Sequence, residues 1–144
     1  MLLIMKKISL GFLLGIFGYI DWKKREVPVV LLIAVALMGM GFCILERRPI
    51  ESVIYACVPG ILMLIFSKIS RESMGYGDGL LLLGMGAFLT YKSVVVISLM
   101  ALGIGGIIAL VLVAMCHKKG NFEIPFIPFL TLSYMIWMAK EMGI

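Results

Sequence analysis

Long apolar runs alternate with short charged or glycine-rich segments along the chain. A membrane-spanning helix needs about 20 mostly apolar residues, and lipid leaves such a segment no way to satisfy its backbone except as a helix. The pattern predicts six such helices, at residues 4–20, 27–45, 53–66, 80–89 with some flank, 94–116 and 126–139. We therefore expect an all-α, polytopic membrane protein, a bundle of six transmembrane helices that forms one domain over residues 1–144.

The composition agrees with this class and excludes others. Hydrophobic residues make up 62% of the chain and charged residues 15%, with a mean hydropathy of +1.14. These are too few charges to cover a water-soluble domain. The three cysteines lie in apolar runs, without the spacing of a disulfide framework or a zinc site. The net charge of +5 suggests basic loops that face anionic lipid rather than nucleic acid. We expect no metal, no cofactor and no nucleic-acid partner.

Two of the apolar segments are short, and each adjoins an aspartate. Residues 8–20 precede Asp21, and residues 80–89 follow Asp78. Ten residues of helix cover about 15 Å, roughly half of the hydrocarbon core, so the polar flank must supply the missing length. Both carboxyl groups are therefore expected at or just inside the membrane interface.

The order of the six helices places the two aspartates on one side of the membrane. The chain crosses away through the second helix and returns through the third, so Asp21 and Asp78, 57 positions apart, lie on the same side. That side carries seven lysine and arginine residues and the other side six, so the positive-inside rule does not settle the orientation. The tight cluster Lys23-Lys24-Arg25 favours a cytoplasmic location for the aspartates.

Two carboxyl groups held close together can carry out acid–base chemistry. Because like charges at short distance cannot both ionise, one carboxyl group keeps its proton while the other acts as a base. One aspartate can then take a proton from water, and the other can protonate or polarise a peptide carbonyl. Asp21 and Asp78 are therefore candidate catalytic residues for peptide hydrolysis by an activated water.

Each aspartate also has a purely structural interpretation. Asp78 lies in Gly75-Tyr76-Gly77-Asp78-Gly79 and could be the N-cap of the following helix. Asp21 could pair with Lys24 or Arg25 about one helical turn further on. The glycines leave the backbone free to adopt positive φ and to approach an extended peptide closely, which favours a substrate-binding loop. The other six acidic residues are interpreted as solvated charges beside basic residues or in water.

Glycines within two of the predicted helices indicate close helix packing. They are Gly39 and Gly41 in the second helix and Gly103, Gly105 and Gly106 in the fifth. The single histidine, His117, stands beside two lysines and is interpreted as an interfacial polar residue.

Three segments together resemble the type IV prepilin peptidase family, the bacterial aspartic membrane proteases of the GxGD class. Gly75-Tyr76-Gly77-Asp78 matches the GxGD signature, and Gly79 and a leucine-rich helix follow it as in the family. Asp21, with a basic run after it and Pro28 seven positions on, resembles the segment of the first catalytic aspartate.

The third segment is Glu123-Ile-Pro125-Phe126-Ile-Pro128-Phe129, which resembles the Pro-Phe-x-Pro element before the last helix of the family. GxGD alone is a weak pattern. All three segments in this order, within a chain of six predicted spans, are more specific and cover most of the sequence.

The resemblance implies that Asp21 and Asp78 are the catalytic aspartates of a metal-independent endopeptidase in the bacterial cytoplasmic (inner) membrane. It implies a site that faces the cytoplasm and cuts a short basic leader from prepilin-like proteins, after a glycine just ahead of their hydrophobic helix. In this orientation Lys6 and Lys7 would have to snorkel to the outer interface. The motif residues that accompany the aspartates, as substrate loop or motif, are Gly75, Tyr76, Gly77, Gly79, Pro28, Pro125 and Pro128.

The sequence also departs from the family in two respects. Val29 follows Pro28, where the family often has an asparagine. Larger members carry an N-terminal cytoplasmic region with cysteine pairs, associated with N-methylation of the trimmed pilin. This chain resembles the short, peptidase-only members, so methylation is not predicted.

Other functions fit some of the same residues. A small proton- or ion-coupled transporter could use Asp21 and Asp78 as buried ion-binding carboxylates, with a broken fourth helix. A protease-like assembly partner without activity, and a GxGD protease with a different substrate, are further alternatives. The sequence indicates neither the oligomeric state nor the individual substrate.

Overall fold

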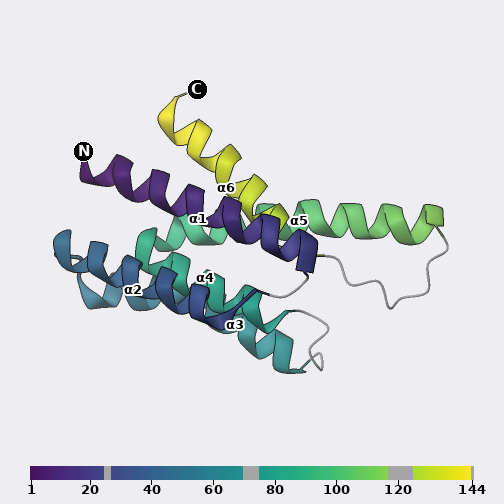
Figure 1. Cartoon of the computed structure of the whole chain (residues 1–144), viewed down its shortest axis with the longest axis horizontal. Helices are drawn as coiled ribbons and strands as arrows, with labels where there is room; N and C mark the ends of the chain where they lie inside the picture. Colours follow the sequence, from purple (N-terminus) through teal and green to yellow (C-terminus); the bar gives the residue numbers. More distant parts are fainter. Residues whose placement is uncertain (25–26, 70–74, 117–124, 144) are drawn as a thin grey trace.

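The computed structural model describes residues 1–24, 27–69, 75–116 and 125–143, which form six helices (Figure 1). The helices are α1 (Leu2–Lys24), α2 (Val29–Leu45), α3 (Ile50–Ile69), α4 (Tyr76–Phe88), α5 (Tyr91–Cys116) and α6 (Ile127–Met142). A helix occupies each of the six predicted apolar segments. The described residues contain no strand, so the all-α prediction is confirmed.

Three of the helices are long and apolar enough to cross a membrane. They comprise Leu3–Lys24, Ile50–Ile69 and Tyr91–Met115, and the apolar helix α2 is shorter. Together they indicate a polytopic membrane protein. That all six helices span the bilayer stays a prediction.

Helix α4 is the centre of the arrangement. It packs between α2 and α3, while α1 lies along α6 and α5 contacts α3 and α6. The second half of α5 extends past the ends of its neighbours (Figure 1), and its apolar side chains, including Leu110 and Met115, are exposed. Exposed apolar side chains of this kind also occur on α1, α2, α3 and α6, as expected for a surface in lipid.

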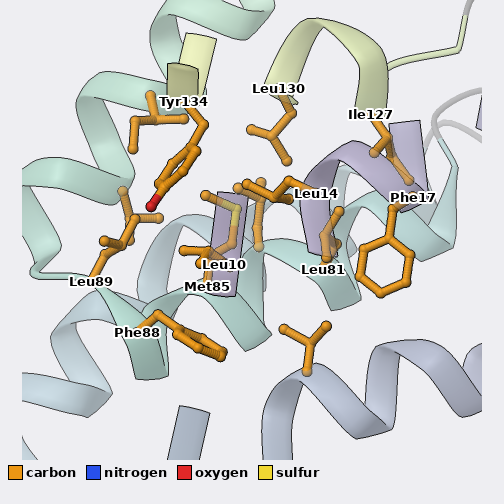
Figure 2. Close-up of a cluster of buried hydrophobic side chains, with 14 of the residues drawn as sticks. Leu10, Leu14, Phe17, Leu81, Met85, Phe88, Leu89, Ile127, Leu130 and Tyr134 are labelled. Carbon is orange, nitrogen blue, oxygen red and sulfur yellow. The ribbon is translucent and has the colours of Figure 1, made fainter. Parts of the chain in front are cut away.

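The hydrophobic core lies where α1, α4 and α6 meet (Figure 2). Its side chains are spaced three or four residues apart, so that each helix turns one face inward. They include Leu10, Leu14 and Phe17 of α1, Leu81, Met85 and Phe88 of α4, and Leu130 and Tyr134 of α6. Because lipid is as apolar as this core, close packing rather than escape from water holds the helices together.

Helices α3 and α4 approach each other at backbone distance. A Cβ atom on Gly60 of α3 would lie 2.6 Å from the backbone nitrogen of Leu83. One on Gly86 of α4 would lie 2.7 Å from the carbonyl oxygen of Ala56, and Gly79 is crowded by an α3 leucine in the same way. Small residues therefore determine the position of α4 against α3.

The glycines predicted to pack between helices divide into two groups. The prediction is confirmed for Gly39, whose Cβ would lie 2.6 Å from the Ala87 side chain, and for Gly105, which lies against Phe129. It is wrong for three others, which have no atom within 4 Å of a Cβ because they lie on exposed faces: Gly41, Gly103 and Gly106.

Arg48 closes the far end of the short helix α4. With 13 residues, α4 is about 20 Å long, and its last carbonyl groups end inside the protein. Arg48 donates from Nη1 to the Ala87 carbonyl at 3.1 Å and from Nη2 to the Leu89 carbonyl at 3.1 Å. The Cys43 thiol also donates to the Ala87 carbonyl, at 3.0 Å. These donors satisfy carbonyl groups that would otherwise lack partners.

Two lysines near the start of α1 are held by ion pairs. Lys6 is buried, and its Nζ lies 2.6 Å from the Glu46 carboxylate. Lys7 pairs with Glu141 at 2.8 Å and lies over the ring of Trp137. The expected solvation of Glu46 is therefore wrong, because Lys6 and Glu46 each supply the counter-charge that the other needs once it is removed from water.

Candidate active site

Asp21 lies in the last turn of α1 and turns its side chain toward the start of α6. Only 7% of the residue is exposed, and its Oδ2 accepts a hydrogen bond of 3.2 Å from the backbone N–H of Ile127. The alternative pairing with Lys24 is not observed, since neither ion pair in the described part of the chain involves Asp21. Arg25 lies outside the described residues.

The start of α6 explains why this N–H group is free to bind a carboxylate. The N–H groups of Phe129 and Leu130 both donate to the Phe126 carbonyl, and Pro128 has no N–H. Ile127 therefore provides the donor at this helix start, where the helix dipole also favours negative charge. The proline of the Pro-Phe-x-Pro element thus leaves Asp21 a single, well-defined backbone partner.

Asp78 lies in the first turn of α4, two residues after the helix begins. The N-cap is Gly75, which makes no side-chain cap bond, so the interpretation of Asp78 as N-cap is wrong. Gly75 has a φ of −58°, and the next two glycines lie within the helix, so the expected positive φ does not occur in this segment. Gly79 instead serves helix packing, because a Cβ atom there would lie 2.7 Å from the Leu64 side chain of α3. The expected approach of an extended peptide to this segment stays a prediction.

Asp21 and Asp78 lie at the same end of the bundle, where α1 ends and α4 begins (Figure 1). Both residues are buried, Asp21 with 7% and Asp78 with 8% of the residue exposed. No ion pair within the described ranges provides either with a counter-charge. Two carboxyl groups held close together can share a single proton, because like charges at short distance cannot both ionise.

The other motif residues surround this end of the bundle. Tyr76 is 58% exposed and Gly77 is half-buried. Pro28 is the exposed N-cap of α2, and Pro125 and Pro128 are half-buried at the start of α6. Glu123, which belongs to the same motif, lies outside the described residues.

Exposed aromatic residues flank Asp21 along α1. Tyr19 and Trp22 are 67% and 68% exposed, and Lys23 and Lys24 follow them. Aromatic side chains of this kind gather at the membrane–water interface, which agrees with the expected depth of the aspartates. An apolar groove of about 570 Å³ between α1 and α6 reaches Tyr19, but neither aspartate lines it.

The structure adds one functional group that the sequence interpretation missed, the N–H of Ile127. A proline in the first turn of a predicted helix was the available signal, because proline marks a helix start and the first N–H groups of a helix have no partner within it. Within the described ranges, no group of three or more His, Cys, Asp or Glu side chains is placed to hold a metal ion.

Comparison with known proteins assigns the chain to a family. Residues 8–110, which include both aspartates, match the model of the type IV leader peptidase family. The chain belongs to this family.

Curated relatives agree with the assignment. The chain is 27% identical over 143 residues to a prepilin leader peptidase/N-methyltransferase of Aeromonas salmonicida strain A449, covering 94% of this chain and 48% of the relative. A protein of the same name from Aeromonas salmonicida gives the same values. The chain thus spans about half the length of the curated relatives it matches. No solved structure matches the chain.

Proposed function

We propose that this protein is an intramembrane aspartic endopeptidase that removes the short basic leader from prepilin-like precursors, at the cytoplasmic face of a bacterial inner membrane. The observation that carries the proposal is that Asp21 and Asp78 are both buried, in the last turn of α1 and the first turn of α4, which lie at the same end of the bundle. Membership of the type IV leader peptidase family supports the same reaction.

The surroundings of the two carboxyl groups suggest different roles. The N–H of Ile127 stabilises negative charge on Asp21, so Asp21 is assigned as the base. Asp78 receives no hydrogen bond from another side chain or backbone group in the described residues and is assigned as the acid that carries the shared proton.

The reaction then follows from these two states. Asp21 takes a proton from a water molecule as the water oxygen bonds to the scissile carbonyl carbon, and Asp78 gives its proton to the carbonyl oxygen. In the second step Asp21 returns its proton to the leaving nitrogen while the C–N bond breaks. A hydroxyl proton of the intermediate passes back to Asp78, and the site is restored.

The exposed start of α4 suits an extended substrate. Gly75 and Tyr76 are exposed beside the buried Asp78, so a leader in extended conformation could lie against them while the apolar helix of the precursor stays in the bilayer. The basic leader and the paired acids are also complementary in charge.

Cleavage in cells tests the proposal directly. Prepilin-like proteins from the same genome are co-expressed with the wild type, Asp21→Asn, Asp78→Asn and the control Glu51→Gln, which changes an exposed carboxylate at the start of α3. Mass spectrometry of the N-termini should show trimming with the wild type and the control only. Trimming by Asp78→Asn, or none by a wild type confirmed in the membrane, would contradict the proposal.

A further inference from the structure

Besides the Lys7–Glu141 ion pair, three hydrogen bonds attach helix α6 to α1 at intervals along the two helices. The Ile127 N–H donates to Asp21, the Thr131 hydroxyl to the Leu14 carbonyl at 2.8 Å, and the Tyr134 hydroxyl to the Lys7 carbonyl at 2.7 Å. The acceptors on α1 lie at residues 21, 14 and 7, seven positions apart. The donors on α6 lie at residues 127, 131 and 134, in the opposite direction and four and three positions apart. The series therefore fixes how far α1 can slide or turn against α6.

Two glycines on α1 make room for the donors. A Cβ atom on Gly18 would lie 2.9 Å from Thr131 Oγ1, and one on Gly11 would lie 3.2 Å from Cε1 of Tyr134. The glycines are also seven residues apart. A side chain in place of Gly18 would displace the Thr131 hydroxyl, and one in place of Gly11 would press against the Tyr134 ring.

Of the two side-chain donors on α6, Thr131 lies closer in the series to Asp21. It also contacts the first turn of α6, which holds the N–H that binds Asp21. Its Oγ1 lies 2.8 Å from the Leu14 carbonyl and 2.9 Å from the carbonyl of Ile127, so its single proton serves one or the other acceptor. Ile127 is also the residue whose N–H binds Asp21. A shift of one residue on α1 would move Asp21 by about 1.5 Å and turn it by about 100°, away from this donor.

We propose that Thr131, seated against Gly18, is a positioning residue that sets the register of α1 so that Asp21 meets the N–H of Ile127. Thr131 touches no reacting atom in this scheme. The expected effect of Thr131 on kcat rests on the proposed peptidase function. The expected effect of Thr131 on the position of Asp21 does not.

Kinetics of purified variants on a prepilin-like substrate test the first consequence. Thr131→Val keeps the shape and removes the hydroxyl, so kcat should fall about tenfold to a hundredfold with KM unchanged, because a misplacement near 1 Å has effects of this size. Thr131→Ser should restore most of kcat. Ser98→Ala is the matched control, since its buried hydroxyl donates only within its own helix, and it should match the wild type.

Gly18→Ala disturbs the contact between Gly18 and Thr131 from the α1 side. It provides a second test of the proposal if Thr131→Val does not fold. It should lower kcat to a similar extent. Wild-type kcat in either variant, or equal losses of kcat and affinity in Thr131→Val and Thr131→Ser, would overturn the positioning role while leaving the peptidase function in place.

A second measurement does not depend on cleavage. In the Asp78→Asn background, Asp21 is labelled with a membrane-permeant carbodiimide and the labelled peptide is quantified by mass spectrometry. The Thr131→Val variant should change the labelling rate of Asp21 severalfold, whereas Ser98→Ala should not. An unchanged rate overturns the positioning role. A wild type that cleaves no precursor overturns the proposed function alone.

Discussion

Gly60 of α3 and Leu83 of α4 face each other so closely that a Cβ atom on Gly60 would lie 2.6 Å from the Leu83 backbone nitrogen. A backbone atom cannot move aside as the end of a side chain can, so Gly60→Ala must push the two helices apart. We expect it to lower the free energy of unfolding by about 1–3 kcal/mol, measured by titration with denaturing detergent in mixed micelles.

Gly41→Ala is the control for this substitution. Gly41 lies in the middle of a helix, but nothing stands within 4 Å of its Cβ position. Alanine should therefore be neutral there or stabilising by up to about 1 kcal/mol, from helix propensity alone. Equal stabilities of Gly60→Ala and Gly41→Ala would show that α3 and α4 are not in backbone contact.

The two glycines before Asp78 should respond differently to alanine. A Cβ on Gly75 would lie 3.0 Å from Oδ2 of Asp78, whereas one on Gly77 would lie 3.8 Å from Leu32, an ordinary contact. Gly75→Ala should displace the carboxyl group by a few tenths of an ångström and reduce kcat about tenfold. Gly77→Ala should retain most of the activity in the same cleavage assay. A greater loss in Gly77→Ala would contradict this explanation of the motif.

Arg48 should contribute more to the free energy of unfolding than an exposed residue in a turn between helices would. Arg48→Gln removes the charged donor from the Ala87 and Leu89 carbonyls, and we expect a loss of about 2–3 kcal/mol in unfolding free energy. Its neighbour Arg47 is exposed, so Arg47→Gln should have little effect. The same loss in both variants would indicate a general effect of surface charge instead.

The buried pair of Lys6 and Glu46 should behave as a unit. Lys6→Met leaves a carboxylate without its partner and should destabilise the protein by about 3–5 kcal/mol, whereas Lys6→Met combined with Glu46→Leu should recover most of this loss. Lys7→Met breaks a pair whose Glu141 side chain is 48% exposed, and it should cost no more than about 1 kcal/mol. Additive effects of Lys6→Met and Glu46→Leu would contradict the ion pair.

The sequence was informative about the helices and about which aspartates belong together. The positions of the helices can be predicted because an apolar segment of sufficient length has only the helical conformation available in lipid. The order of the predicted helices placed Asp21 and Asp78 on one side, and the structure has both residues buried at one end of the bundle. Their catalytic role stays a prediction.

Contacts between distant segments were beyond the sequence pattern. The hydrophobic periodicity does not say which face of an all-apolar helix meets protein and which meets lipid, so Gly103 was expected to pack and Gly60 was overlooked. The pairing of Lys6 with Glu46, 40 residues apart, depends on which helix ends meet. The group that donates to Asp21 is a backbone N–H, and the residue types in the sequence do not indicate which backbone group will donate.

The bond between Ile127 and Asp21 joins groups 106 residues apart, and this has a consequence for biosynthesis. Asp21 is made long before its donor, and α1 can pair with α6 only when α6 has been made. During translation the Asp21 carboxyl group therefore lacks the hydrogen bond from the Ile127 N–H until α6 has been made. A nascent chain thus contains both aspartates well before Asp21 has its hydrogen-bond donor, and under the proposed mechanism hydrolysis begins only once α1 and α6 have paired.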